Sequence, residues 1–219
     1  MSGVSLVIGS TGLIGKKLIF ELAKKDSEVI AISRRSISNL PENVTLLNLN
    51  FDDFLDNGCV PSCDHIYICL GTTIKKAGSQ SEFKKVDFDY SVSFARKARE
   101  AGATKISLVS SVGANPYAKN FYLKIKGEVE EEIKKIDFQS INIFRPSLLL
   151  GHREEGRFLE KIGQNLSSFI NPLLIGSLRK YRGIKSSNVA YFMANCEKSS
   201  GIKYFYFDDF NNNFERENQ

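Results

Sequence analysis

Gly9-Ser10-Thr11-Gly12-Leu13-Ile14-Gly15 is the stretch that decides the fold of this 219-residue chain. It follows the apolar run Val4 to Ile8 and leads directly into a helical pattern, which predicts a strand that turns tightly into a helix. Three glycines at three-residue spacing allow the tight turn, the approach of a phosphate group and close helix–strand packing. The first N–H groups of the helix then face the phosphate. An ordinary glycine-rich turn has the same pattern, so the rest of the chain must show whether this turn binds a phosphate.

Apolar and helical segments alternate after this turn. We expect strands at residues 4–8, 28–33, 44–49, 66–70, 105–110 and 139–144, and helices at 13–23, 79–101 and 117–136. The continuous apolar run Val29 to Ile32, in which three of the four residues are β-branched, is typical of a strand buried on both faces of a parallel sheet. This alternation predicts an α/β fold, a Rossmann-type doubly wound parallel sheet with ligands at the carboxyl end of its first strand.

The chain changes character from about residue 151. Helical patterns at 157–166 and 187–196 flank a break at 170–174, and a short strand is expected at 203–207. We expect a single NAD(P)-binding domain over residues 1–210, in which about 151–210 form a small C-terminal elaboration on the substrate side. A polar tail at 211–219 follows.

Composition indicates an ordinary globular protein, with 42% hydrophobic and 25% charged residues. The formal net charge of +5 is spread over lysine doublets, which favours solvated faces over a nucleic-acid surface. No apolar run has the roughly 18 residues that a membrane span needs, and residues 1–3 lead into a strand instead of a signal peptide. We therefore expect a cytoplasmic location, without nucleic-acid or membrane partners. Oligomeric state and protein partners stay open.

The four cysteines, Cys59, Cys63, Cys69 and Cys196, are expected to be reduced structural thiols. Cys69 falls in an apolar strand and Cys196 in a predicted helix, positions that bury a thiol. Cys59 and Cys63 lie near His65, but their spacing is not that of a zinc knuckle and no second pair of ligands follows. We expect no metal site.

The end of the second predicted strand indicates which dinucleotide the turn binds. NAD-binding chains usually carry Asp or Glu there, about 20 residues beyond the glycines, to accept hydrogen bonds from the ribose hydroxyls. This chain has Ser33, followed by Arg34 and Arg35. Guanidinium groups pair with a 2′-phosphate and stack on adenine, whereas a carboxylate repels that phosphate. We expect NADP(H) as the cofactor and NAD(H) as a weaker ligand; the alternative is an exposed basic pair at a strand end.

Tyr122 and Lys126 are candidate catalytic residues, because a spacing of four places both on one face of the predicted helix 117–136. A nearby ammonium stabilises a phenolate and brings a tyrosine toward acid–base work near neutral pH. Ser111, at the end of the preceding strand, can hydrogen-bond a substrate carbonyl or hydroxyl. A Tyr-x-x-x-Lys pair alone is more often a packed aromatic beside a solvated lysine, but its place after a serine-tipped strand favours catalysis.

Several motifs together resemble one family. They are the glycine turn, Arg34-Arg35, Cys69-Leu70-Gly71-Thr72-Thr73, Lys76-Ala77-Gly78, Ser110-Ser111, Tyr122 to Glu130 and Phe144-Arg145-Pro146. The set is similar to the atypical short-chain dehydrogenase/reductases, and most specifically to the Tat-interacting protein 30 family of oxidoreductases, from about residue 4 to 194.

The resemblance implies a set of cofactor-binding residues. They are Gly9, Thr11, Gly12, Leu13, Ile14 and Gly15 on the pyrophosphate side, Arg34 and Arg35 on the 2′-phosphate, Leu70 and Gly71 along the cofactor beyond the fourth strand, and Leu149 and Arg157 toward the nicotinamide half. It also implies that Tyr122 donates or accepts a proton, while Lys126 binds the nicotinamide ribose. One departure is Asp87, which stands where many short-chain reductases carry an asparagine that organises a proton-relay water.

These observations predict an NADP(H)-dependent oxidoreductase that transfers hydride between nicotinamide and a carbonyl or alcohol of a small-molecule substrate. Two alternatives stay open. One is an NADP(H)-sensing regulatory protein that binds a protein partner without turnover, and the other is a sugar-nucleotide epimerase-like enzyme. Residues 163–182, on the expected substrate side, match no family pattern.

Overall fold

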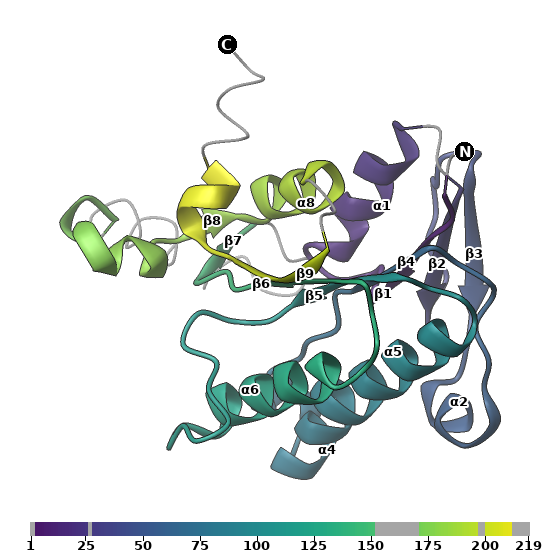
Figure 1. Cartoon of the computed structure of the whole chain (residues 1–219), viewed down its shortest axis with the longest axis horizontal. Helices are drawn as coiled ribbons and strands as arrows, with labels where there is room; N and C mark the ends of the chain where they lie inside the picture. The colour runs from purple at the N-terminus through teal and green to yellow at the C-terminus, as the bar shows by residue number, and fades with distance from the viewer. Residues whose placement is uncertain (1–2, 26–27, 152–170, 197–199, 212–219) are drawn as a thin grey trace.

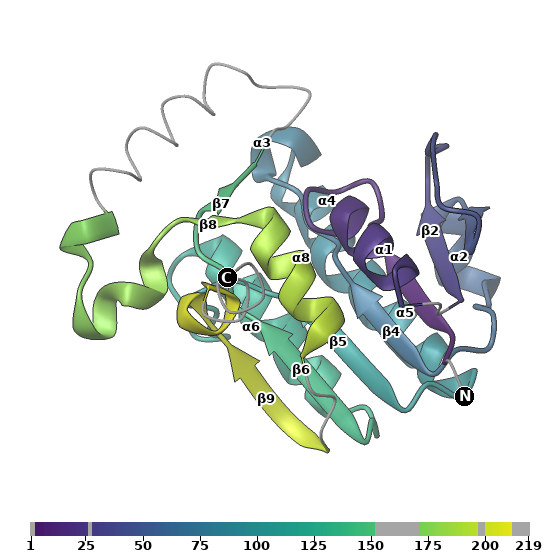
Figure 2. The same ribbon diagram turned by 90° about the horizontal axis from the view of Figure 1, so that it is seen from above.

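The computed structural model describes residues 3–25, 28–151, 171–196 and 200–211. Within them, seven parallel strands form one sheet in the order β3-β2-β1-β4-β5-β6-β9 (Figures 1 and 2). The strands are β1 (Ser5–Ile8), β2 (Val29–Ser33), β3 (Val44–Asn48), β4 (His65–Ile68), β5 (Lys105–Val109), β6 (Ser140–Phe144) and β9 (Gly201–Phe205). The Rossmann-type doubly wound sheet expected from the sequence is confirmed.

Helices cover both faces of the sheet (Figure 1). On one face α1 (Gly15–Ala23) packs against α8 (Ser186–Asn195), and on the other lie α2 (Phe51–Asn57), α5 (Tyr90–Glu100) and α6 (Phe121–Lys134). The described chain also contains shorter elements: α3 (Ile74–Ala77), α4 (Gln80–Lys84), η1 (Lys85–Asp89), β7 (Leu149–Leu150), η2 (Asn171–Leu173), η3 (Gly176–Tyr181), β8 (Ile184–Lys185) and a helical turn at 207–211.

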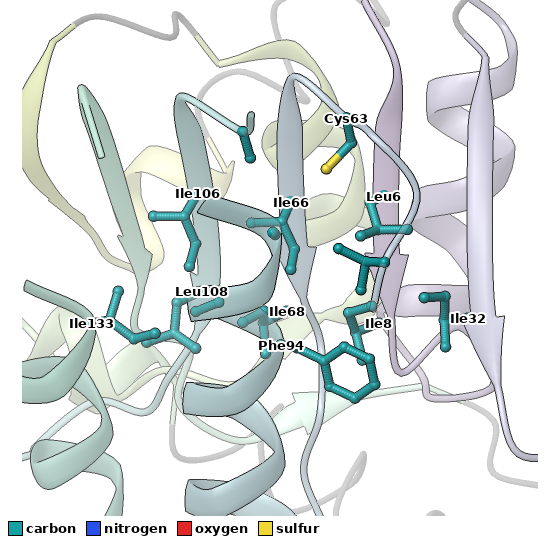
Figure 3. Packing of buried hydrophobic residues seen from close by; sticks show 14 of the residues in the cluster. Leu6, Ile8, Ile32, Cys63, Ile66, Ile68, Phe94, Ile106, Leu108 and Ile133 are labelled. Carbon is teal, nitrogen blue, oxygen red and sulfur yellow. The ribbon is translucent and has the colours of Figure 1, made fainter. Parts of the chain in front are cut away.

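Alternate residues of β1 contribute to two separate cores. Leu6 and Ile8 belong to the core under α5 and α6, whereas Val7 belongs to the core under α1 and α8. Figure 3 shows the first core, in which the ring of Phe94 from α5 lies beside Ile8 and Ile68. All four residues of β1 are buried, because helices cover both faces of the sheet at this strand. This burial explains why apolar residues follow one another from Leu6 to Ile8 instead of alternating with polar ones.

The carboxyl ends of β1 and β4 meet where the strand order reverses. From β1 the chain adds β2 and β3 on one side, and it then returns to place β4 on the other side of β1. The Cys69 N–H donates a hydrogen bond to the Ile8 carbonyl oxygen at 2.8 Å, so the two strand ends stay paired up to this point. Doubly wound sheets bind their ligands at such a reversal.

The helix predicted over 79–101 is present, because α4, η1 and α5 follow one another without a break from Gln80 to Glu100. The sequence did not predict that its middle part, η1, is π-helical, or that α3 forms a separate short helix before it. A π-helical turn is wider than an α-helical turn, so it changes which side chains face the sheet. Asp87, in the middle of η1, is thereby only 1% exposed. The apolar spacing of the flanking α-helices hides this change in the sequence.

Other predicted boundaries differ by a few residues. The helix predicted at 117–136 begins at Phe121, because the side chain of Asn120 caps it by accepting a hydrogen bond from the Leu123 N–H at 3.1 Å. The helix α2 was not predicted, although Asn50 caps it in the same way.

The C-terminal part contributes more to the core than expected. The strand predicted at 203–207 is β9 at 201–205, and it extends the main sheet by pairing in parallel with β6. The helix predicted at 187–196 is α8, which packs on α1. The helix predicted at 157–166 lies outside the described residues.

Phe94→Ala should lower the free energy of unfolding by about 3–5 kcal/mol, because truncating a buried ring leaves a cavity. Phe94 is fully buried and its ring stacks on Phe54 with centroids 3.9 Å apart. Phe20→Ala is the matched control on α1, since Phe20 is 37% exposed and its loss should cost about 1 kcal/mol or less. Urea unfolding followed by circular dichroism measures both variants; equal losses would contradict this core.

Candidate functional site

The glycine turn lies against the end of β4. Gly9 has a φ of +83°, and a Cβ atom on it would lie 2.7 Å from the carbonyl carbon and oxygen of Cys69. A Cβ atom on Gly15 would lie 2.3 Å from the Gly9 carbonyl oxygen. Glycine is therefore required at both positions, first for the turn beside β4 and then for the start of α1. Buried Ser10 donates a hydrogen bond to the Ile32 carbonyl oxygen at 3.0 Å, which ties the turn to β2.

The start of α1 fits a pyrophosphate group. The Gly12 N–H donates to the Gly9 carbonyl oxygen at 3.0 Å and closes the turn. Among the described residues, no side chain caps the helix at Ile14. Thr11 and Gly12 are exposed and Leu13 is half-buried, so the backbone before α1 faces solvent. An uncapped helix start behind a glycine turn presents N–H groups to a phosphate.

Arg34 and Arg35 are exposed and follow β2 at the carboxyl edge of the sheet. The guanidinium of Arg34 lies over the ring of Phe51, 5.6 Å from its centroid. Arg34 also borders an open depression of about 390 Å³, lined in addition by Asn48, Leu49 and Asn50. Ser33 replaces the carboxylate of NAD-binding chains, and its Oγ accepts a hydrogen bond from the Arg35 N–H at 3.0 Å. This edge fits the adenosine end of a dinucleotide.

Tyr122 and Lys126 lie one turn apart on α6 in different surroundings. Tyr122 is half-buried, and its ring lies 5.8 Å from that of Phe83 between centroids. Lys126 is only 6% exposed; its Nζ lies 2.7 Å from Asp87 Oδ1 and 3.5 Å from the Leu70 carbonyl oxygen. Lys126 is therefore not a solvated lysine, as it would be if the Tyr122–Lys126 pair had only a packing role.

Asp87 connects α6 to the loop after β4. Its Oδ2 accepts a hydrogen bond from the Thr72 N–H at 3.0 Å, while its Oδ1 faces Lys126. A Cβ atom on Gly71 would lie 3.8 Å from Lys126 Nζ and 3.9 Å from Asp87 Oδ1, so the ion pair sits directly behind Gly71. Burial lowers the pKa of Lys126, but the nearby Asp87, Tyr122 and Glu130, with Asp87 the strongest of the three, together raise it above its ordinary value.

A second buried ion pair on α6, between Glu130 and Arg145, was missed from the sequence. Arg145 donates to both oxygens of Glu130, with Nε 3.0 Å from Oε1, and its Nη1 donates to the Tyr206 hydroxyl at 3.1 Å. The hydroxyl of Ser110 donates to the same Oε1 of Glu130. Spacing places Glu130 on the same face of the helix as Lys126, but it does not identify Arg145 as the partner.

Ser111 is half-buried at the end of β5, and its hydroxyl lies 3.3 Å from the Val112 carbonyl oxygen. Its neighbour Ser110 points inward to Glu130, which leaves Ser111 as the serine on the solvent side of this strand end. Leu149 is half-buried in β7, where it pairs with Ile184. Arg157 lies outside the described residues.

The residues considered for a metal have other surroundings. His65 is 2% exposed and its Nε2 lies 2.9 Å from Ser107 Oγ, while Cys59 is exposed and Cys63 buried. Burial raises the pKa of the Cys63 thiol to about 11. In the part of the chain that the structure describes, no three His, Cys, Asp or Glu side chains gather as metal ligands would.

Comparison with known proteins identifies the family. The model of the NAD dependent epimerase/dehydratase family matches residues 5–212. The chain belongs to this family. Protein FMP52, mitochondrial, of Eremothecium gossypii is 33% identical over 183 residues, which are 82% of this chain and 77% of that protein. Protein HTATIP2 of Rattus norvegicus is 35% identical over 157 residues, 69% of this chain and 64% of that protein. The resemblance to the Tat-interacting protein 30 family is thus confirmed.

Solved structures with the same fold support this place in the epimerase/dehydratase family. A human epimerase family protein, SDR39U1 with NADPH, has a TM-score of 0.62 at 18% identity, over 93% of this chain and 74% of that chain. MoeE5 in complex with UDP-glucose and NAD has a TM-score of 0.66 at 16% identity, over 93% and 76%. At such identities the likeness shows the fold alone.

The expected cytoplasmic location is contradicted by these comparisons. The FMP52 relatives of Eremothecium gossypii, Candida albicans and Saccharomyces cerevisiae are all named mitochondrial. The expectation rested on composition and on the lack of an apolar run, and neither feature distinguishes one aqueous compartment from another. In the described segments no helix combines the length and the apolar character needed to cross a bilayer.

Glu130→Gln should lower the free energy of unfolding by about 3 kcal/mol, because it leaves the Arg145 guanidinium without its buried counter-charge. The matched control is Glu131→Gln, the next residue on α6, whose side chain is 48% exposed and pairs only with Lys134 in the described structure. That change should cost about 0.5 kcal/mol or less. Urea unfolding at pH 7 compares the two; a Glu130→Gln loss as small as the control's would refute the buried pair.

Proposed function

We propose that this epimerase/dehydratase-family protein is an NADP(H)-dependent oxidoreductase that interconverts a carbonyl and an alcohol. The observation that carries the proposal is the buried Lys126, whose Nζ lies behind Gly71 and one helical turn from Tyr122. A buried, charged lysine can both bind ribose hydroxyls and stabilise the tyrosine phenolate. If Lys126 only filled space in the core, it would need neither its charge nor its position beside the loop after β4.

Each candidate residue has a distinct role in this proposal. The cofactor, when bound, supplies or accepts the hydride. Tyr122 gives a proton to the substrate oxygen in reduction and removes it in oxidation, and Lys126 favours the deprotonated form between these events. Ser111, on the solvent side of the end of β5, hydrogen-bonds the same substrate oxygen and orients it. The half-buried position of Tyr122 leaves its ring within reach of a small molecule.

The preference for NADP(H) rests on the edge of the sheet after β2. Arg34 and Arg35 supply positive charge there, and Ser33 removes the carboxylate that would repel a 2′-phosphate. The NADPH bound to the human structural neighbour supports the same preference. The ring of Phe51 under Arg34 holds that guanidinium near the depression in which we place the adenosine end.

Arg34→Ala/Arg35→Ala should weaken NADPH binding about ten- to hundredfold and leave NADH binding almost unchanged, because it removes charged hydrogen bonds to the 2′-phosphate. Nucleotide fluorescence titration measures both affinities. Lys75→Ala/Lys76→Ala, an exposed basic pair after β4, is the control for a general loss of positive charge. Equal wild-type affinities for the two nucleotides would refute the preference.

Tyr122→Phe should reduce the rate of NADPH oxidation with a panel of small carbonyl compounds about 10²- to 10⁴-fold, since the proton donor is lost. NADPH affinity should stay close to that of the wild type. Tyr117→Phe is the control, because Tyr117 is 91% exposed and outside the site. Unchanged turnover in Tyr122→Phe would contradict the catalytic role. NADPH binding without oxidation of NADPH by the wild type would favour the sensor or the epimerase-like alternative.

A further inference from the structure

Asp87 stands in an unusual place for a charged side chain. It lies in the middle of the π-helical segment η1 and is 1% exposed. Single π-helical turns between α-helices occur frequently at functional sites. The wider turn of η1 brings this carboxylate under the loop after β4, where α6 presents Lys126.

The two oxygens of Asp87 face two donors. Oδ1 lies 2.7 Å from the Lys126 ammonium, and Oδ2 accepts the Thr72 N–H at 3.0 Å. An asparagine has a single acceptor oxygen, so its amide group would meet one of these donors with its own N–H groups. Only the ionised carboxylate satisfies both donors. The geometry therefore requires a negative charge at a position where a neutral relay residue is common in related reductases.

Four titratable groups surround Lys126. They are Asp87 on η1, Tyr122 and Glu130 on α6, and Cys69 after β4. The negative charge of Glu130 pairs with Arg145, which donates hydrogen bonds to both carboxylate oxygens. Burial raises the pKa of the Cys69 thiol to about 12, so this thiol is neutral near pH 7. Among the described residues, the compensating charge for Lys126 is thus that of Asp87.

We infer that Asp87 is a positioning residue, which keeps Lys126 charged and directs it at Leu70 and Gly71, the residues expected to line the cofactor beyond β4. This inference rests on the proposed function. A buried lysine without a counter-ion loses its proton at a pH several units lower than an exposed one. Removal of the Asp87 charge should therefore make the ammonium titrate in the neutral to mildly alkaline range, where the wild-type ammonium does not.

NADPH affinity as a function of pH tests this role. Fluorescence titrations run from pH 7 to 9.5, above the second ionisation of the 2′-phosphate near pH 6. Wild-type affinity should be nearly flat, whereas that of Asp87→Asn should fall about tenfold or more as Lys126 loses its proton. Lys126→Met and Asp87→Asn/Lys126→Met should both be flat and equal in affinity, because Asp87 acts through Lys126. A purely structural loss would lower affinity equally at every pH.

Asp89→Asn is the matched control, since Asp89 is exposed on the same segment η1 and should keep the wild-type profile. If Asp87→Asn does not fold, NMR of wild-type protein labelled at lysine Cε, with the Lys126 signal assigned from Lys126→Met, tests the charge state that the inference requires. Lys126 should stay charged up to pH 10, and titration below pH 10 would overturn the inference. If the wild type binds NADPH and the Asp87→Asn profile is flat, only the role of Asp87 is overturned. If the wild type does not bind NADPH, the proposed function is overturned as well.

Discussion

The close approach of two backbones at the carboxyl ends of β1 and β4 is the constraint on which the rest of the structure depends. Gly9 turns there with a positive φ, and its missing side chain leaves room for the Cys69 carbonyl. Because the Cys69 N–H also bonds to Ile8, the loop that follows β4 begins beside the glycine turn. The glycine turn and the Leu70–Gly71 segment are thereby neighbours, although about sixty residues separate them in the chain.

Helix α6 meets this strand edge through charges instead of apolar contacts alone. Lys126 pairs with Asp87 below the β4 loop, and Glu130 pairs with Arg145 from the end of β6. Buried ion pairs contribute little net stability, because the cost of removing both charges from water offsets their attraction. Their effect is geometric. Because each charged side chain must reach its partner, the two pairs fix the rotation of α6 about its own axis and its distance from the sheet. Tyr122, on the same face, is positioned by the same two pairs.

Membership of the epimerase/dehydratase family and this geometry support one another. The family accounts for the nicotinamide-binding fold and for the likeness to FMP52 and HTATIP2 proteins. The structure adds a lysine that is buried and paired, which a packing or surface role does not explain.

Local sequence determined the elements whose signals lie within a few residues. The glycine turn, the apolar strands, the Arg34-Arg35 pair and the shared helical face of Tyr122 and Lys126 all follow from spacing alone, because backbone sterics and helical periodicity act locally. Tertiary structure decided the rest. The π-helical turn that buries Asp87, its pairing with Lys126, the pairing of Glu130 with Arg145 and the place of β9 beside β6 join segments 15 to 61 residues apart. Charge pairing across such separations depends on which strand ends the topology makes neighbours, and no local pattern contains that information.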